Sequence, residues 1–425
     1  MTGEDMKAII LAGGRGTRLA SLRTDIPKAL MPVCGVSVLE RQIALLRREG
    51  IRDVTLVCGH LAQQIKDYFG DGEAFGVHIG YYTEAQPLGT AGALFCLDLR
   101  EDFLLLNGDL VFDVDLGSMI RFHEQKRAYA TLFAHPSTHP FDSMWIGAGQ
   151  DGRVRAFCRA QERPAFAHNL SNAGIAILSP ELLRSCTKRA PMDLDRDVLM
   201  PNVEGGRIFA YRSCEYVKDM GTPQRLREVE RDLALGIPEK RRKNRPHAAV
   251  FLDRDGTLNV YRGYISDPDA IELLPGAAEA VRRINEKGYL AVLVTNQPVV
   301  ARGACSIETL DDIHCRLEAL LGAQGAYLDA IYFCPHHPDR GFAGENPLYK
   351  TDCDCRKPKP GMLLRAAQEM NIDMAQSVMV GDTMTDVQTA QNAGCRPVLL
   401  CGQENNPHVP NVQVCADLMQ FAQTL

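Results

Sequence analysis

The chain has 425 residues, of which 45% are hydrophobic and 24% are charged, and its formal net charge is −6. This length exceeds the roughly 250–300 residues at which a single hydrophobic core stops growing, so we expect two domains. The ordinary composition excludes a disordered or fibrous chain. The negative net charge provides no broad basic field for nucleic acid or anionic lipid.

The N-terminus indicates where the protein resides. Residues 1–5 are acidic and run directly into the apolar stretch 7–11, which is too short and wrongly flanked for a signal peptide. No later apolar run is long enough to span a membrane. We therefore expect a cytoplasmic protein without membrane insertion, whose 14 cysteines are mostly reduced, buried or metal-bound. Oligomeric state stays open, a homo-oligomer included.

A polar, basic stretch bracketed by prolines divides the sequence. We interpret residues 237–246 as a linker between a first domain, residues 1–236, and a second domain, residues 247–425. A short basic run between two apolar-periodic regions is more often a solvated tether than a nucleic-acid site.

Both halves alternate short apolar strands with amphipathic helices. The strands are nearly continuous apolar runs, which is typical of parallel sheets covered on both faces. We expect strands at residues 8–12, 54–57, 103–106, 248–252, 290–294 and 377–380. The fold class is therefore α/β, with two doubly wound domains whose ligands bind at the carboxyl ends of the strands.

A glycine-rich segment, Gly-Gly-Arg-Gly-Thr-Arg-Leu at residues 13–19, follows the first predicted strand. Its glycines allow backbone N–H groups to approach a phosphate closely, while Arg18 and Lys28 supply cationic charge for a triphosphate. Neither the P-loop pattern nor the dinucleotide-binding pattern fits this segment.

Together with later motifs, this segment resembles the sugar-1-phosphate nucleotidyltransferase family over residues 6–235. The later motifs are Leu88–Gly92, Asn107–Asp109, Glu162–Pro164, Asn172–Gly174 and Lys218–Pro223. The resemblance implies a Rossmann-like domain in which Asp109 and Asp219 hold Mg²⁺, and Arg18 and Lys28 act on the triphosphate. It also implies nucleotide contacts from Gly13, Gly14, Gly16, Thr17 and Gly89, and sugar or phosphate contacts from Glu162, Arg163 and Asn172. Arg163 stands where the family usually has lysine, which changes a point charge to a planar fork.

A second set of chemical motifs begins with Asp253 and Asp255, which stand directly after the strand predicted at 248–252. Two acids spaced by one residue at a strand end suit a nucleophile and a proton-transfer group. Thr295, Lys357 and Asp382 follow in order. This order resembles the haloacid dehalogenase superfamily of phosphatases over residues 247 to 402.

The second resemblance implies a role for each of these residues. Asp253 becomes phosphorylated, Asp255 protonates the leaving group and then activates water, and Thr295 and Lys357 bind the phosphoryl oxygens. Mg²⁺ is held by Asp253, the backbone carbonyl of Asp255 and Asp382. Lys359 competes with Lys357 for its role, and Asp386 is a weaker candidate beside the metal.

Three cysteines and a histidine form two tight pairs, Cys334 with His336 and Cys353 with Cys355. This donor set and spacing predict a closed, structural Zn²⁺ site, with His337 as an alternative ligand. The loop resembles that of the heptose 1,7-bisphosphate 7-phosphatases and the related histidinol-phosphate phosphatases. That resemblance implies substrate contacts from a set of polar residues: Tyr261, Asn296, Gln297, Arg302 and Arg356. Pro298 and Thr383 depart from its usual pattern.

The two resemblances together predict consecutive steps on one sugar. Removal of a 7-phosphate leaves a heptose 1-phosphate, and this is the nucleophile for nucleotidyl transfer. The first half looks most like the guanylyltransferases that use D-glycero-D-manno-heptose, which favours GTP and a GDP-heptose product used in lipopolysaccharide. Another nucleoside triphosphate or sugar phosphate, histidinol phosphate as the phosphatase substrate, and one domain serving as a degenerate regulatory module remain alternatives.

Overall fold

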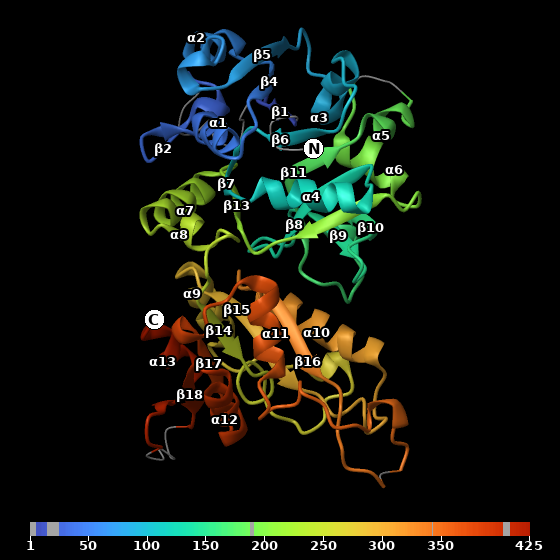
Figure 1. Ribbon diagram of the computed structural model, residues 1–425, viewed down its shortest axis with the longest axis vertical. Helices are drawn as coiled ribbons and strands as arrows, with labels where there is room; N and C mark the ends of the chain where they lie inside the picture. Colours follow the sequence, from blue (N-terminus) through green and yellow to red (C-terminus); the bar gives the residue numbers. More distant parts are fainter. Residues whose placement is uncertain (1–5, 15–24, 188–190, 342, 403–408) are drawn as a thin grey trace. The chain divides into compact units, whose positions relative to one another are not determined.

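The computed structural model describes residues 6–14, 25–187, 191–341, 343–402 and 409–425. It divides into two compact units (Figure 1). The first comprises Met1–His135, Met144–Ala160 and Ser171–Arg242, and the second comprises Pro136–Ser143, Gln161–Leu170 and Lys243–Leu425. Two short segments of the N-terminal half therefore belong to the second unit. Within the described ranges, no helix has the length and apolar character needed to cross a membrane.

The first unit is built on a large mixed sheet. The described strands follow the order β10-β9-β11-β6-β1-β4-β5, and β8 pairs with both β11 and β12. Strands β6, β1, β4 and β5 are parallel, whereas β11 is antiparallel to β6, β8 and β9. Its strands are β1 Lys7–Leu11, β4 Asp53–Cys58, β5 His78–Thr83, β6 Phe103–Asn107, β8 Ala130–His135, β9 Met144–Ala148, β10 Val154–Arg159, β11 Ser171–Leu178 and β12 Ile208–Arg212.

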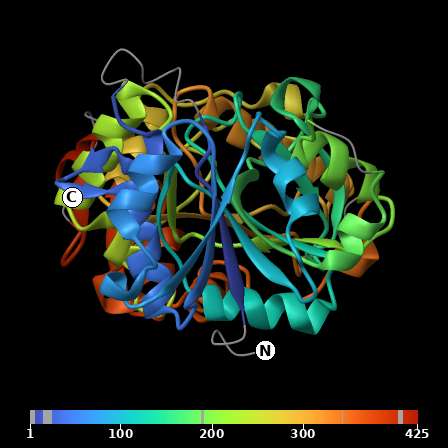
Figure 2. The same cartoon turned by 90° about the horizontal axis from the view of Figure 1, so that it is seen from above.

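Helices cover this sheet because each has one apolar face. Ile43 and Leu46 of α1, Phe69 of α2 and Met119 of α4 belong to the same buried cluster as Ile10 of β1. Figure 2 shows β1, in dark blue, among the strands of the sheet. The helices are α1 Val38–Arg48, α2 Ala62–Phe69, α3 Gly89–Gly92, α4 Leu116–Lys126, α5 Pro180–Arg184, α6 Met200–Asn202, α7 Pro223–Ala234 and α8 Ile237–Lys240. Two small sheets complete the unit: β2 Pro32–Val33 with β3 Val36–Ser37, and β7 Leu110–Asp113 with β13 Tyr216–Asp219.

The second unit contains a six-stranded parallel sheet in the order β16-β15-β14-β17-β18-β19. Alternate residues of its strands face opposite sides. Val250 and Leu293 belong to one buried cluster with Ile284 of α9, Leu317 of α10 and Phe421 of α13. The elements are β14 Ala249–Leu252, α9 Ala277–Glu286, β15 Leu290–Asn296, α10 Ile307–Gly322, β16 Ala330–Cys334, α11 Gly361–Met370, β17 Val378–Gly381, α12 Met384–Ala393, β18 Arg396–Leu400, β19 Gln413–Cys415 and α13 Leu418–Gln423.

These observations confirm the predicted α/β class, because each unit is built from strands and helices around a central sheet. The predicted strands match β1, β4, β6, β14, β15 and β17 to within a residue or two. The stretch predicted as a linker begins as helix α8, whose Ile237 and Pro238 are buried, and Arg242 forms an ion pair with Glu49. Residues 237–242 therefore pack within the first unit, although their composition resembles that of a tether.

Candidate active sites and cysteine cluster

Asp253 lies directly after β14, at the carboxyl edge of the second sheet. Its backbone N–H donates to the carbonyl of Val380 on the neighbouring strand, at 3.0 Å. The side chain is buried, and Lys357 Nζ lies 2.7 Å from its Oδ1. Burial raises the pKa of Asp253 to about 6, and Asp386 acts in the same direction, whereas Lys357 opposes the shift. A buried carboxylate at this position therefore depends on one lysine for its counter-charge.

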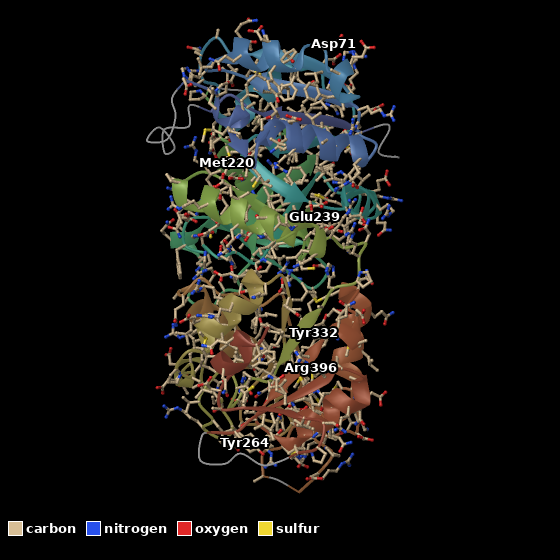
Figure 3. The ribbon with its side chains drawn as sticks, turned by 90° about the vertical axis from the view of Figure 1, so that its left-hand side faces the viewer. Asp71, Met220, Glu239, Tyr264, Tyr332 and Arg396 are labelled. Carbon is tan, nitrogen blue, oxygen red and sulfur yellow. The ribbon has the colours of Figure 1, made fainter. Side chains whose placement is uncertain are left out.

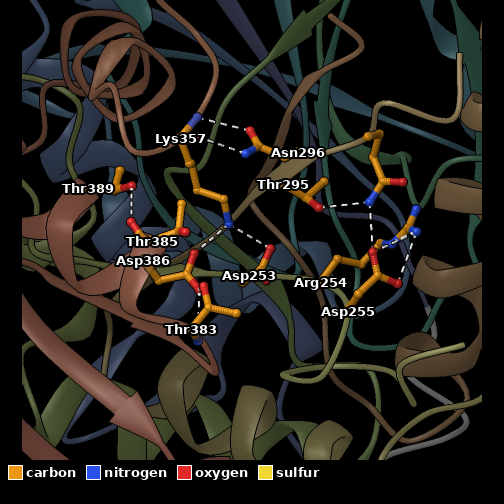
Figure 4. Close-up of polar contacts among 11 residues, drawn as sticks. Asp253, Arg254, Asp255, Thr295, Asn296, Lys357, Thr383, Thr385, Asp386 and Thr389 are labelled. Atoms are coloured by element: carbon orange, nitrogen blue, oxygen red, sulfur yellow. Dashed lines mark hydrogen bonds and ion pairs between the residues drawn. The ribbon is translucent and has the colours of Figure 1, made fainter. Parts of the chain in front are cut away.

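Lys357 joins two carboxylates (Figure 4). Its Nζ also donates to Asp386 Oδ1 at 2.6 Å, and the lysine side chain is almost completely buried. The other oxygen of Asp386 accepts hydrogen bonds from the backbone N–H and the hydroxyl of Thr383, the residue that caps the start of α12. Lys359 instead forms an exposed pair with Asp352. The lysine that faces the buried carboxylates is thus Lys357.

Asp253, Asp382 and Asp386 each offer a carboxylate oxygen, and these atoms lie within 4.8 Å of one another. Oδ1 of Asp382 is buried without a hydrogen-bond partner in the described part of the chain. Because hard oxygen donors are what Mg²⁺ requires, this group fits such an ion. Gly256 has a φ of +81°, and a Cβ at that residue would lie 2.0 Å from Asp382 Oδ2. The turn after Asp255 therefore needs glycine both for its backbone conformation and for the space it leaves.

Asp255 faces a different set of partners. Its carboxylate accepts hydrogen bonds from Arg254 Nη2 at 2.9 Å, Asn259 Nδ2 at 3.0 Å and Gln297 Nε2 at 2.8 Å. Gln297 also donates to the hydroxyl of Thr295 at 2.9 Å. Figure 4 shows Asp253 and Asp255 pointing to opposite sides of this turn, Asp253 towards Lys357 and Asp255 towards Arg254. Arg254 and Asn259, which hold Asp255, were not predicted as site residues.

Of the remaining residues predicted for the second site, Asn296 contacts this centre and the others have different partners. The side-chain amide of Asn296 makes two hydrogen bonds with the backbone of Lys357, at 3.0 and 3.1 Å. Arg356 donates to the carbonyl of His336 at 3.2 Å. The guanidinium of Arg302 lies 4.7 Å from the ring centroid of the exposed Tyr264, which is labelled in Figure 3. Tyr261 is also largely exposed.

The four predicted metal ligands form a cluster at the end of β16. The Sγ atom of Cys353 lies 3.5 Å from that of Cys334 and 3.2 Å from that of Cys355. His336 Nδ1 lies 3.7 Å from Cys334 Sγ and 3.4 Å from Cys355 Sγ. These separations are close to the edges of a tetrahedron with metal–ligand bonds of about 2.0–2.3 Å, so the group fits one zinc-like ion. His337 Nδ1 instead accepts a hydrogen bond from the backbone of Asp339.

In the first unit, Gly13 and Gly14 follow β1, while Gly16, Thr17 and Arg18 lie outside the described residues. Lys28 forms an ion pair with Asp109. The backbone N–H of Met220 donates to the carbonyl of Asp109 at 3.1 Å, which brings Asp219, the last residue of β13, beside it. Asp219 is paired with Arg225 at 3.0 Å. The backbones of the two predicted Mg²⁺ ligands are therefore adjacent.

A second part of the first unit surrounds the short helix α3. Gly89 has a φ of +81°, and a Cβ there would lie 2.2 Å from the carbonyl of Met192. Asn172 donates to Asp195 Oδ1 at 3.3 Å. Burial raises the pKa of Asp195 to about 7, and Asp193 adds to the rise. Asp195 was not predicted as a site residue. It is one of several charged residues in the stretch 193–197, and such a stretch usually lies on a solvated surface.

Glu162 and Arg163 lie in the segment Gln161–Leu170, which belongs to the second unit. The Arg163 guanidinium lies 5.0 Å from the ring centroid of Phe141, on the other short segment of that unit. Asn172 belongs to the first unit.

Comparisons with known proteins match two families to successive parts of the chain, and their limits differ from those of the two compact units. The nucleotidyl transferase family model matches residues 7–235, and the haloacid dehalogenase-like hydrolase model matches residues 204–394. A D-glycero-beta-D-manno-heptose-1,7-bisphosphate 7-phosphatase of Yersinia pestis is 45% identical over 157 residues, which are 36% of this chain and 81% of that protein. The phosphatase of the same name from Escherichia coli K12 is 40% identical over 165 residues, 38% of this chain and 84% of that protein.

A solved structure, HddC from Yersinia pseudotuberculosis complexed with GMP-PN, covers 54% of this chain and 99% of its own, with 23% identity and a TM-score of 0.46. The two folds and their acidic sites define an enzyme with a nucleotidyl transfer domain and a phosphatase domain. The chain belongs to the nucleotidyl transferase family, and its second part belongs to the haloacid dehalogenase-like hydrolases with the heptose bisphosphate phosphatases.

Proposed function

We propose that the second unit removes the 7-phosphate of D-glycero-D-manno-heptose 1,7-bisphosphate and that the first unit transfers GMP from GTP to the resulting heptose 1-phosphate. One observation carries the proposal: a chain with a nucleotidyl transferase domain also contains a phosphatase domain 45% identical to an enzyme named for a heptose 1,7-bisphosphate. The phosphatase product is then the nucleophile of the second reaction. All of these substrates are small phosphorylated molecules.

In the phosphatase reaction, Asp253 attacks phosphorus, the bond from phosphorus to the sugar oxygen breaks, and Asp255 protonates that oxygen. Asp255 then takes a proton from the water that hydrolyses the aspartyl phosphate. Lys357, already 2.7 Å from Asp253, and Thr295 bind the phosphoryl oxygens. Asp253, Asp382 and the backbone carbonyl of Asp255 would hold Mg²⁺, which neutralises charge on the phosphoryl group.

The hydrogen bonds from Arg254, Asn259 and Gln297 hold the carboxylate of Asp255 on the side of the turn away from Lys357. One carboxylate is thus kept beside the lysine for attack, and the other is kept apart for proton transfer. This separation is what a two-carboxylate mechanism requires, because each acid then acts in a different environment.

In the nucleotidyl transfer, an oxygen of the sugar phosphate attacks the α-phosphorus of GTP and pyrophosphate leaves. Lys28 and Arg18 bind the triphosphate, Gly13, Gly14, Gly16, Thr17 and Gly89 contact the nucleotide, and Asn172 contacts the sugar phosphate. Asp109 and Asp219 would hold Mg²⁺, which neutralises charge between the phosphates. The cysteine cluster would hold Zn²⁺ in a structural role, since four protein ligands leave no open position.

The test is incubation of the purified chain and Mg²⁺ with each anomer of the heptose 1,7-bisphosphate and each of the four common nucleoside triphosphates. Mass spectrometry should detect phosphate release followed by GDP-heptose and pyrophosphate. The Asp253→Asn variant should release no phosphate but should still convert heptose 1-phosphate that is supplied directly into GDP-heptose. The Asp109→Ala variant should release phosphate but form no GDP-heptose. Preferred hydrolysis of histidinol phosphate, or transfer from another nucleotide at a higher kcat/KM, would overturn the corresponding half of the proposal.

A further inference from the structure

A third group of metal-ligating side chains lies in the second unit, and it shares no residue with the acidic group or with the cysteine cluster. His168, in the segment Gln161–Leu170, meets Asp311 and Cys315 of α10. Asp311 and Cys315 are four residues apart and therefore share one face of that helix. One donor atom from each of the three residues lies within 4.8 Å of the others.

The orientation of the His168 ring is fixed. Its Nδ1 lies 2.6 Å from Oε2 of Glu318, whose side chain is buried, and its Nε2 lies 3.1 Å from Oδ1 of Asp311. Metal-binding histidines commonly hydrogen-bond a carboxylate through one ring nitrogen and bind the metal through the other. Glu318 takes the first position, which leaves Nε2, on the side of Asp311, for a metal ion.

The donors have the chemistry of a transition-metal site. Imidazole nitrogen, carboxylate oxygen and thiolate sulfur are the three ligand types of Zn²⁺ in proteins. Bringing atoms within 4.8 Å to the edges of a zinc tetrahedron, about 3.3–3.8 Å, requires a movement of roughly 1 Å. Cys315 is buried, whereas the side chain of Asp311 is 56% exposed. The cluster is thus anchored on one side and accessible to an incoming ion on the other.

We propose that His168, Asp311 and Cys315 bind a Zn²⁺ ion, with Glu318 orienting the imidazole and a water molecule completing the coordination. The ion would fasten the segment Gln161–Leu170 to α10. A network of hydrogen bonds and ion pairs without metal is the competing explanation, and the two differ in metal content and in the role of the thiol.

The experiment compares bound zinc in the full-length protein, stripped with chelator and re-equilibrated with Zn²⁺, by inductively coupled plasma mass spectrometry. Wild type should carry one more zinc per chain than Asp311→Ala and Cys315→Ser. Asp312→Asn, a neighbouring acid on the same helix outside the cluster, is the matched control and should keep the wild-type content. The comparison is a difference between variants, so it does not depend on whether the cysteine cluster also binds zinc.

A second measurement uses Co²⁺, whose thiolate bond gives a charge-transfer band in the near ultraviolet. Asp311→Ala should weaken the part of that band that comes from Cys315, and Cys315→Ser should remove that part. The affinity for Zn²⁺ should fall by at least about tenfold in Asp311→Ala. Asp311 is exposed, so its variant tests the site even if Cys315→Ser does not fold. Equal zinc content in wild type, Asp311→Ala and Asp312→Asn would overturn the proposal.

Discussion

Lys357 Nζ donates a hydrogen bond of 2.7 Å to Asp253 in a position where neither side chain is appreciably exposed. The same nitrogen reaches Asp386 at 2.6 Å. The lysine is therefore the single described cation within hydrogen-bond distance of both carboxylates, and its removal would leave two buried acids uncompensated. Substitution of each lysine in turn therefore tests whether Lys357 or Lys359 serves the phosphatase site.

Lys357→Met should abolish phosphate release, by about a hundredfold or more, and should destabilise the second unit by about 3 kcal/mol, because breaking one side of a buried ion pair leaves an unpaired charge. Lys359→Met is the matched control. Its pair with Asp352 is exposed and screened by solvent, so stability should hardly change, and phosphatase activity should stay within about twofold of wild type. Kinetics and chemical denaturation of both variants measure these effects, and equal losses in the two would contradict the assignment.

Gly256→Ala should reduce Mg²⁺ affinity and phosphatase activity, because the new Cβ would lie 2.0 Å from Asp382 Oδ2. The control is Gly263→Ala. Gly263 also has a positive φ, of +72°, but no atom lies within 4 Å of its added Cβ. Backbone strain is thus similar in both variants, and only Gly256→Ala displaces the carboxylate. Mg²⁺ titrations of activity should show a shift for Gly256→Ala alone, and a similar shift in both would mean that strain, not displacement, is responsible.

The sequence was sufficient to predict the polar residues that follow the buried strands of the second unit, for a physical reason. Strands buried on both faces are recognisable as apolar runs, and residues following them must lie at one edge of the sheet. Asp253, Thr295 and Asp382 were placed in this way. Arg254 was passed over because an arginine between two acids looks like a surface residue, yet it is completely buried against Asp255.

Other features could not be obtained from sequence patterns. The antiparallel strands β9, β10 and β11 follow the parallel part of the first sheet without a change in residue pattern that marks the switch. Residues 136–143 and 161–170 join the second unit through contacts with a part of the chain more than a hundred residues away, such as His168 with Glu318. Local periodicity carries no information about such distant partners.

Asp195 should make the stability of the folded protein depend on pH. Its pKa is raised from the ordinary 3.8 to about 7 by burial and by Asp193, so the folded state binds this proton more tightly than the unfolded chain does. The stabilisation that comes from the tighter binding of this proton is complete below about pH 4 and is lost as the pH rises through about 7. Asp195→Asn removes this titration. The melting temperature of the variant relative to wild type should therefore increase between pH 4 and pH 7 and level off above.

The control for this experiment is Asp98→Asn. Hydrogen bonding to Arg100 lowers the pKa of the exposed Asp98, so its replacement should give no gain at neutral pH. Thermal unfolding of the three proteins at several pH values checks both expectations. A pH-independent difference between Asp195→Asn and wild type would show that the proton on Asp195 is not coupled to folding.

Removal of metal from the cysteine cluster should destabilise the loop that follows β16. Within the described residues 335–341 and 343–352, Gly341 and Gly344 have positive φ values, and Leu348 is 83% exposed, so few apolar contacts hold this stretch. Binding energy from the four donors would replace them. Cys353→Ser or a strong chelator should therefore lower the melting temperature and make the loop sensitive to protease. Cys305→Ser, which changes a cysteine outside the cluster, should leave the cleavage pattern unchanged; equal protection in Cys353→Ser and wild type would mean that protein contacts alone hold the loop.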